Sequence, residues 1–98
     1  MKRIHLIITG KVQGVCFRMN TYKVAKGIGV KGTVRNLSTG EVEVFAEGTE
    51  SQITQLISFC RKGTGIAIVT KILIEFLKPI NEFIDFVIKD KVIKNGIN

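Results

Sequence analysis

The sequence predicts an α+β fold in which two helices cover one face of a single, mostly antiparallel β-sheet. Three observations lead to this prediction. Five short runs carry the alternating or β-branched apolar pattern of strands. Two stretches carry apolar residues at helical spacing, one after the first run and one after the third. A short polar turn that ends in Gly40 separates the second run from the third, as in a β-hairpin.

The first strand is expected at residues 4–9, where apolar residues at every second position face the core and His5 lies on the solvent side. After an intervening loop, Tyr22, Ala25 and Ile28 recur at helical spacing, and nearby glycines end this helix. The second strand is expected at residues 30–36.

The third strand follows at residues 41–47. Thr49 and Gln52 then form the capping box of a second amphipathic helix, which Gly63 can end. A long fourth strand at residues 66–77 and a short fifth strand at residues 84–89 complete the fold. The order βαββαβ with an added C-terminal strand predicts a ferredoxin-like α/β sandwich.

The composition is that of one small globular domain. The chain has 98 residues, of which 45% are apolar and 23% charged. We expect the domain to occupy residues 1–90 and a polar tail to follow at residues 91–98. Cys16 and Cys60 lack the CxxC spacing and a histidine cluster, so we expect free thiols and no metal site. We also expect no cofactor.

The N-terminus begins with basic residues and an apolar run, as a secretion signal does. The run is too short, and no cleavage site follows it before Lys11. No segment is long enough to span a membrane, so we expect a cytoplasmic protein that does not engage membranes.

Positive charge is concentrated in the first part of the chain. The net charge is +7, and residues 1–40 hold eight Lys or Arg and no Asp or Glu. Such a field attracts small anions, and it also attracts nucleic acid.

The segment at residues 10–18, which we call the anion loop, joins the first strand to the first helix. Its sequence is Gly10-Lys11-Val12-Gln13-Gly14-Val15-Cys16-Phe17-Arg18. A loop that leads into a helix exposes backbone N–H groups without intrahelical acceptors, and Gly14 permits the positive φ that lets them converge. Arg18 can fork onto two phosphate oxygens. The common nucleotide-binding glycine patterns are absent here, so we expect a site for one phosphoryl group.

Two motifs in this chain are similar to a known family. The anion loop resembles the signature of the acylphosphatases, and Gly32-Thr33-Val34-Arg35-Asn36 resembles their second signature. The resemblance extends over residues 4–89. It implies the same ferredoxin-like fold, and it implies metal-independent hydrolysis of the carboxyl-phosphate bond of acyl phosphates. Thr33 departs from the family pattern, which usually has a large aromatic residue there.

The resemblance also implies roles for individual residues. Arg18 would bind phosphate together with the backbone N–H groups of Gln13, Gly14, Val15, Cys16, Phe17 and Arg18. Asn36 would orient the attacking water. Taken singly, an arginine at a helix start is usually a solvated charge, and an asparagine before a turn usually serves the turn. A thiolate nucleophile at Cys16 is the less favoured alternative.

Two other functions remain as alternatives. A small basic ferredoxin-like module can bind nucleic acid, but here Phe45 lies between Glu43 and Glu47 on the same strand face, and the acidic flanks repel phosphate. The chain is also similar to the acylphosphatase-like domain of larger carbamoyl-transfer proteins, which the short chain disfavours. We expect a monomer whose partners are a small acyl phosphate and inorganic phosphate, with nucleic acid an unfavoured partner.

Overall fold

The computed structural model describes residues 1–89 and confirms the predicted ferredoxin-like architecture. The predicted tail at residues 91–98 lies outside the described residues. The elements, in chain order, are β1 (Lys2–Lys11), α1 (Phe17–Ile28), β2 (Lys31–Asn36), β3 (Val42–Gly48), α2 (Glu50–Lys62), β4 (Ile68–Leu77) and β5 (Phe86–Lys89). Neither helix in this part of the chain has the length needed to cross a membrane.

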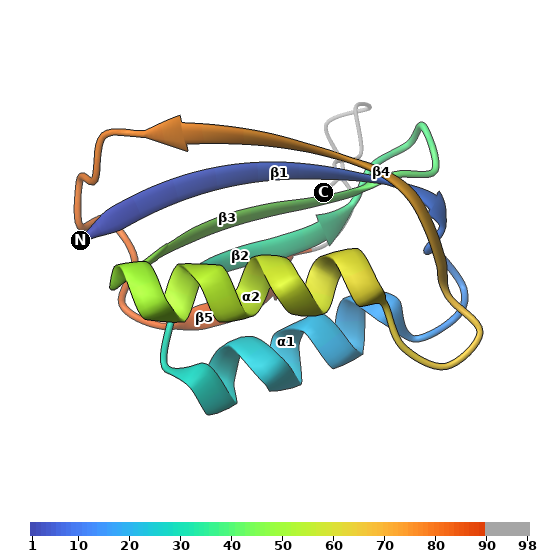
Figure 1. The fold of residues 1–98 in the computed structure, drawn as a ribbon, viewed down its shortest axis with the longest axis horizontal. Helices are drawn as coiled ribbons and strands as arrows, with labels where there is room; N and C mark the ends of the chain where they lie inside the picture. The colour runs from blue at the N-terminus through green and yellow to red at the C-terminus, as the bar shows by residue number, and fades with distance from the viewer. Residues whose placement is uncertain (90–98) are drawn as a thin grey trace, which may run out of the picture.

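The five strands form one sheet in the order β4-β1-β3-β2-β5, with α1 and α2 together on one of its faces (Figure 1). β5 runs parallel to β2, and the other neighbouring strands are antiparallel. The predicted fifth strand therefore extends the sheet beyond β2. The opposite face, which carries no helix of residues 1–89, is called the open face below.

The core lies between the sheet and the two helices. Ile4, Leu6 and Ile8 of β1 are fully buried, as the alternation predicted. They are opposite Ala46, Val44 and Val42 of β3 in the sheet register, and these side chains are buried as well. The even-numbered positions of both central strands thus meet the helices.

The two helices begin differently. Thr49 and Gln52 make both bonds of the predicted capping box at the start of α2, over 3.2 and 2.8 Å. In contrast, α1 begins after Cys16, whose side chain makes no capping hydrogen bond. Arg18 falls in the first turn of α1, as expected. At the other end, the Gly29 N–H donates to Ala25 O, and Gly29 has the left-handed conformation that ends helices.

Two strands begin two residues later than predicted. β4 begins at Ile68 rather than residue 66, because the chain is still in a turn in which the Ala67 N–H donates to Thr64 O at 3.0 Å. β5 begins at Phe86 rather than residue 84. The apolar pattern at residues 66–67 and 84–85 therefore predicted strand at positions that belong to loops.

His5 is on the open face but is not the simple solvent-side residue that the sequence predicted. Its side chain is only 21% exposed. Its Nε2 lies 2.7 Å from the Glu43 carboxylate, and its ring stacks on Phe45 with a centroid distance of 4.3 Å. Phe45 lies opposite Thr33 in the register, so the small side chain of Thr33 adjoins a Phe45 ring that is already stacked.

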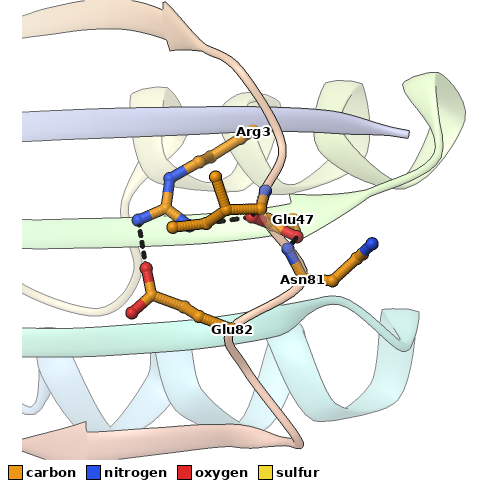
Figure 2. Close-up of polar contacts among 5 residues, drawn as sticks. Arg3, Glu47, Asn81 and Glu82 are labelled. Atoms are coloured by element: carbon orange, nitrogen blue, oxygen red, sulfur yellow. Dashed lines mark hydrogen bonds and ion pairs between the residues drawn. The ribbon is translucent and has the colours of Figure 1, made fainter.

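A buried carboxylate fastens the segment between β4 and β5 to the sheet (Figure 2). Glu47 of β3 is 3% exposed and accepts from Arg3 Nη1 at 2.7 Å. It also accepts from the N–H groups of Ile80 at 3.0 Å and Asn81 at 3.1 Å. Arg3 in turn donates to Glu82 at 2.6 Å. Burial alone would raise the pKa of Glu47, but these hydrogen bonds outweigh it and hold the pKa below its ordinary value.

We predict that Glu47→Ala lowers the free energy of unfolding by about 3 kcal/mol, since it leaves Arg3 buried without its main partner. Because the folded-state pKa of Glu47 is lowered, its contribution is present above the unfolded-state pKa and is lost as the pH falls through the folded-state value. Urea unfolding at neutral and acidic pH measures both effects. The control is Glu82→Gln, which removes the half-exposed partner of Arg3 and should cost less than about 1 kcal/mol. Equal losses in the two variants would contradict the assignment.

Candidate active site

The start of β3, the end of β2 and the last residues of β1 lie together at one end of the sheet, just before the anion loop begins. Val42, the first residue of β3, is opposite Ile8 of β1 and opposite Asn36 of β2. These three residues therefore form one row across the sheet. The chain that leaves β1 passes close to the end of β2, so residues far apart in the sequence converge here.

A β-bulge turns the end of β1 into the loop. The register of β1 against β4 shifts between Thr9 and Gly10. Gly10 has φ +139°, and a Cβ at this position would overlap the backbone carbonyl oxygen of Ile68. Only glycine tolerates both the dihedral angle and the close approach of the neighbouring strand. The first glycine of the anion loop thus sets the direction in which the loop departs.

The loop itself contains two left-handed residues on either side of Val15. Gly14 has φ +74°, as the sequence predicted, and Cys16 has φ +63°. Val12 and Phe17 are buried, and Val15 packs partly against the core, so the loop is anchored on both sides of its turn. Left-handed residues next to right-handed ones occur in loops whose backbone N–H groups bind anions.

The side chain of Gln13 fastens the loop to the turn that follows β2. Its Nε2 donates to Leu37 O and to Glu41 O, both at 2.8 Å. Leu37 N–H also donates to Glu41 O, which closes the turn. Since Asn36 directly precedes Leu37, the two bonds of Gln13 fix the position of Asn36 relative to the anion loop. The sequence indicated only a backbone role for Gln13.

The N-terminus of α1 leaves hydrogen-bond donors free. The first helical bond runs from Asn20 N–H to Cys16 O, so the N–H groups of Phe17, Arg18 and Met19 have no acceptor one turn back. The helix has no side-chain cap, and its first turn contains no acidic residue. These donors and the positive end of the helix dipole favour an anion at this point.

A cavity of about 330 Å³ opens at this helix start. Arg18 and Asn36 both line it, although they come from different elements. Its lining residues are Val12, Gly14, Cys16, Phe17, Arg18, Met19 and Asn36. The structure thus brings the two predicted functional side chains to one cavity together with the anion loop.

One of the residues that line this cavity has a polar atom without a partner. Among residues 1–89, the Oδ1 atom of Asn36 is the buried side-chain oxygen or nitrogen that accepts no hydrogen bond. An unsatisfied buried acceptor costs about 1–3 kcal/mol. A group held in this state by the fold is a candidate ligand for a bound molecule that donates a hydrogen bond, such as water.

The charged groups of the site are positive. No carboxylate of the described residues lies within ion-pair distance of Arg18, whereas Arg3, Lys26 and Arg35 are paired. No group of three His, Cys, Asp or Glu gathers anywhere in residues 1–89. Of the two thiols, Cys60 is buried, which raises its pKa to about 12, and Cys16 is exposed at the cavity.

The cavity brings together Gly14, Cys16, Phe17, Arg18 and Asn36 of the predicted site, whereas Gln13 and Val15 do not line it. Two contributions were not predicted. Val12 and Met19 line the cavity, but neither a buried valine nor a 45% exposed methionine carries a recognisable signal in the sequence. The bonds of the Gln13 side chain were also missed. Their acceptors are backbone carbonyls 24 and 28 residues away, which only the strand register brings near.

Comparison with known proteins agrees with this geometry. The acylphosphatase family model matches residues 4–88. An acylphosphatase of Methylococcus capsulatus is 38% identical over 88 residues, which are 90% of this chain and 96% of the relative.

Solved structures give the same result. The crystal structure of the Bacillus subtilis acylphosphatase superposes with a TM-score of 0.87 at 29% identity, over 91% of this chain and 99% of that one. Full-length HypF in a phosphate- and nucleotide-bound form matches with a TM-score of 0.83 at 28% identity, over 92% of this chain and 12% of HypF. The chain belongs to the acylphosphatase family, whose members are hydrolases that act on acyl phosphates.

Proposed function

We propose that this chain hydrolyses acyl phosphates by in-line attack of water, with Arg18 and the anion loop binding the phosphoryl group and Asn36 orienting the water. One observation carries this proposal. Asn36, whose buried Oδ1 has no hydrogen-bond partner, lines the same cavity as Arg18 and the uncapped start of α1. An acceptor for water and donors for phosphate are thereby combined in a space large enough for one phosphoryl group.

The substrate's phosphoryl oxygens are neutralised by two kinds of donor. The guanidinium of Arg18 offers a planar fork of positively charged N–H groups. The N–H groups of the anion loop, including those at the α1 start, supply further fixed dipoles. Because these donors are already in place, little reorganisation accompanies the spread of charge over the equatorial oxygens in the transition state.

Asn36 acts on the nucleophile. Its Oδ1 accepts a hydrogen bond from a water molecule, which leaves a lone pair of the water oxygen free to face phosphorus. Asparagine is not a base at neutral pH, so the water proton passes to an oxygen of the phosphate. The P–O bond to the acyl group breaks as the new P–O bond forms, and the products are a carboxylate and inorganic phosphate.

The chemistry needs neither a strong general acid nor a cofactor. The leaving group of an acyl phosphate is a carboxylate, which is a stable anion at neutral pH. The charge that a metal ion would otherwise neutralise is met by Arg18 and the backbone N–H groups. The reaction as proposed therefore requires only protein groups and water.

The open face is poorly suited to stack nucleic-acid bases, which supports hydrolysis over the alternative function. The ring of Phe45 is already stacked on His5 and lies 5.4 Å from the Arg3 guanidinium. The nearby basic side chains are also neutralised, since Glu43 pairs with Arg35 at 2.6 Å and Glu47 with Arg3. A stacking surface for RNA needs exposed rings and free cations.

We predict that the purified protein hydrolyses benzoyl phosphate at an unchanged rate in excess EDTA, and that inorganic phosphate inhibits competitively. Release of benzoate measures the first effect, and the rate at increasing phosphate concentration measures the second. Salt-dependent binding of single-stranded RNA without hydrolysis would instead support the nucleic-acid alternative.

We predict that Arg18→Ala lowers kcat/KM for benzoyl phosphate by about 10³-fold and abolishes inhibition by phosphate, because the charged fork on the phosphoryl group is lost. Arg18→Lys is the matched variant, which keeps the charge without the fork and should retain part of the activity. Lys23→Ala removes an exposed positive charge from the same helix and controls for the general field. Phosphate inhibition that persists in Arg18→Ala would contradict the role of Arg18.

We predict that Asn36→Ala lowers kcat by about 10²- to 10³-fold while the inhibition constant of phosphate stays near its original value. The variant should not unfold more easily, since it removes a buried acceptor that has no partner. Thermal unfolding measures this second effect. Ser38→Ala, in the exposed turn nearby, is the control. Full activity in Asn36→Ala would exclude the water-orienting role.

A further inference from the structure

The outer edge of β4 is a long strand edge without a partner. β4 ends the sheet, and no strand in the described part of the chain pairs with its outer side (Figure 1). It has ten residues, most of them apolar, and Ile68, Leu73 and Phe76 are more than half exposed. Unpaired edges with apolar side chains are templates for pairing with another strand.

The sequence of this edge is complementary to itself. β4 contains two charged residues, Lys71 and Glu75, which lie at equal distances from Leu73. If a second copy of β4 pairs antiparallel about a two-fold axis at Leu73, Lys71 stands directly opposite Glu75 of the partner subunit. The same arrangement occurs a second time by symmetry. Opposite charges across an antiparallel pair stabilise it, and like charges destabilise it.

The other two-fold registers lack this match. In an antiparallel pair, directly opposed residues point to the same face of the sheet. The register can therefore shift only in steps that keep the helix-side residues of both copies on one face. Moving the axis to Ile72 places Lys71 opposite Leu73 of the partner subunit, and moving it to Ile74 places Glu75 opposite the partner's Leu73. Moving it to Lys71 or Glu75 sets like charges against each other. Only the axis at Leu73 pairs opposite charges.

The side chains at this edge are available for such a contact. The Glu75 side chain is 68% exposed, and its carboxylate lies 3.7 Å from His5 Nδ1. Ile72 and Ile74 pack partly on the core from the helix side, so pairing would set each beside the partner's other isoleucine and extend the core across the axis. The irregular position at the β1 bulge lies outside residues 71–75, so this central stretch is regular.

We propose that two copies of this chain associate through β4, in antiparallel register about Leu73, to form one continuous ten-stranded sheet. The contact is short, so the dimer is a reversible one that forms at high protein concentration. This inference does not depend on the proposed catalytic roles, and it is an alternative to the monomer expected from the sequence.

A charge exchange tests the register. In Glu75→Lys, lysines oppose one another at both symmetric positions, and we expect dimerisation measured by sedimentation equilibrium to weaken roughly tenfold or more. The double variant Lys71→Glu/Glu75→Lys restores both pairs in reverse, and its dimerisation constant should return to within about threefold of the original. Glu50→Lys makes the same charge change on α2, away from the edge, and should leave the constant unchanged. Wild-type protein that stays monomeric at millimolar concentration overturns the proposal, as does a dimer that tolerates Glu75→Lys.

A cross-linking experiment covers the case in which Glu75→Lys fails to fold. With Cys16 replaced by serine, Leu73→Cys places a thiol opposite itself across the axis and should form a disulfide dimer under mild oxidation. Glu75→Cys places its thiol opposite Lys71 of the partner subunit and should cross-link far more slowly. Equal rates for the two variants would show that the register is wrong. Circular dichroism reports independently whether each variant is folded.

Discussion

The site depends on one constraint of the sheet, the row in which Val42 lies opposite both Ile8 and Asn36. This register fixes where β1 ends relative to where β2 ends, and the chain has no freedom to change it without turning the core residues of β1 outward. The bulge at Gly10 then sets the direction in which the loop leaves β1, and the side chain of Gln13 binds the loop to the turn after β2. The strand register determines the coarse position of the anion loop, and two hydrogen bonds determine the fine position.

The fold could be predicted because its signals are local. The alternation in β1, the capping box at Thr49 and the apolar stripe of α2 are each complete within a few neighbouring residues. The ends of β4 and β5 were misplaced, since apolar composition does not distinguish a strand from the loop that leads into it. Asn81, in the left-handed conformation, and the buried ion pair of Glu47 gave no warning in the sequence.

The site was predictable in part, for a related reason. Arg18, Gly14 and Asn36 stand in two recognisable motifs, and the structure brings them to one cavity. What escaped prediction is how the motifs are held together. The Gln13 side chain donates to backbone carbonyl groups. Every residue has such a group, so the sequence does not indicate which ones accept these bonds. Likewise, His5 looks like a solvent residue until Glu43 and Phe45 from another strand are placed beside it.

The contact between Arg3 and Glu82 joins residues 79 positions apart. β1 is the first strand of the chain, yet one of its neighbours in the sheet is β4, which ends at Leu77. During synthesis, the edge of β1 that pairs with β4 therefore stays unpaired until nearly all of the described chain has left the ribosome. The entropy cost of closing such a long loop comes before the stabilising contacts between its ends form, and this slows folding. A newly made chain of this kind therefore leaves one edge of β1, a strand with buried apolar residues, unpaired during most of its synthesis, a state that favours aggregation.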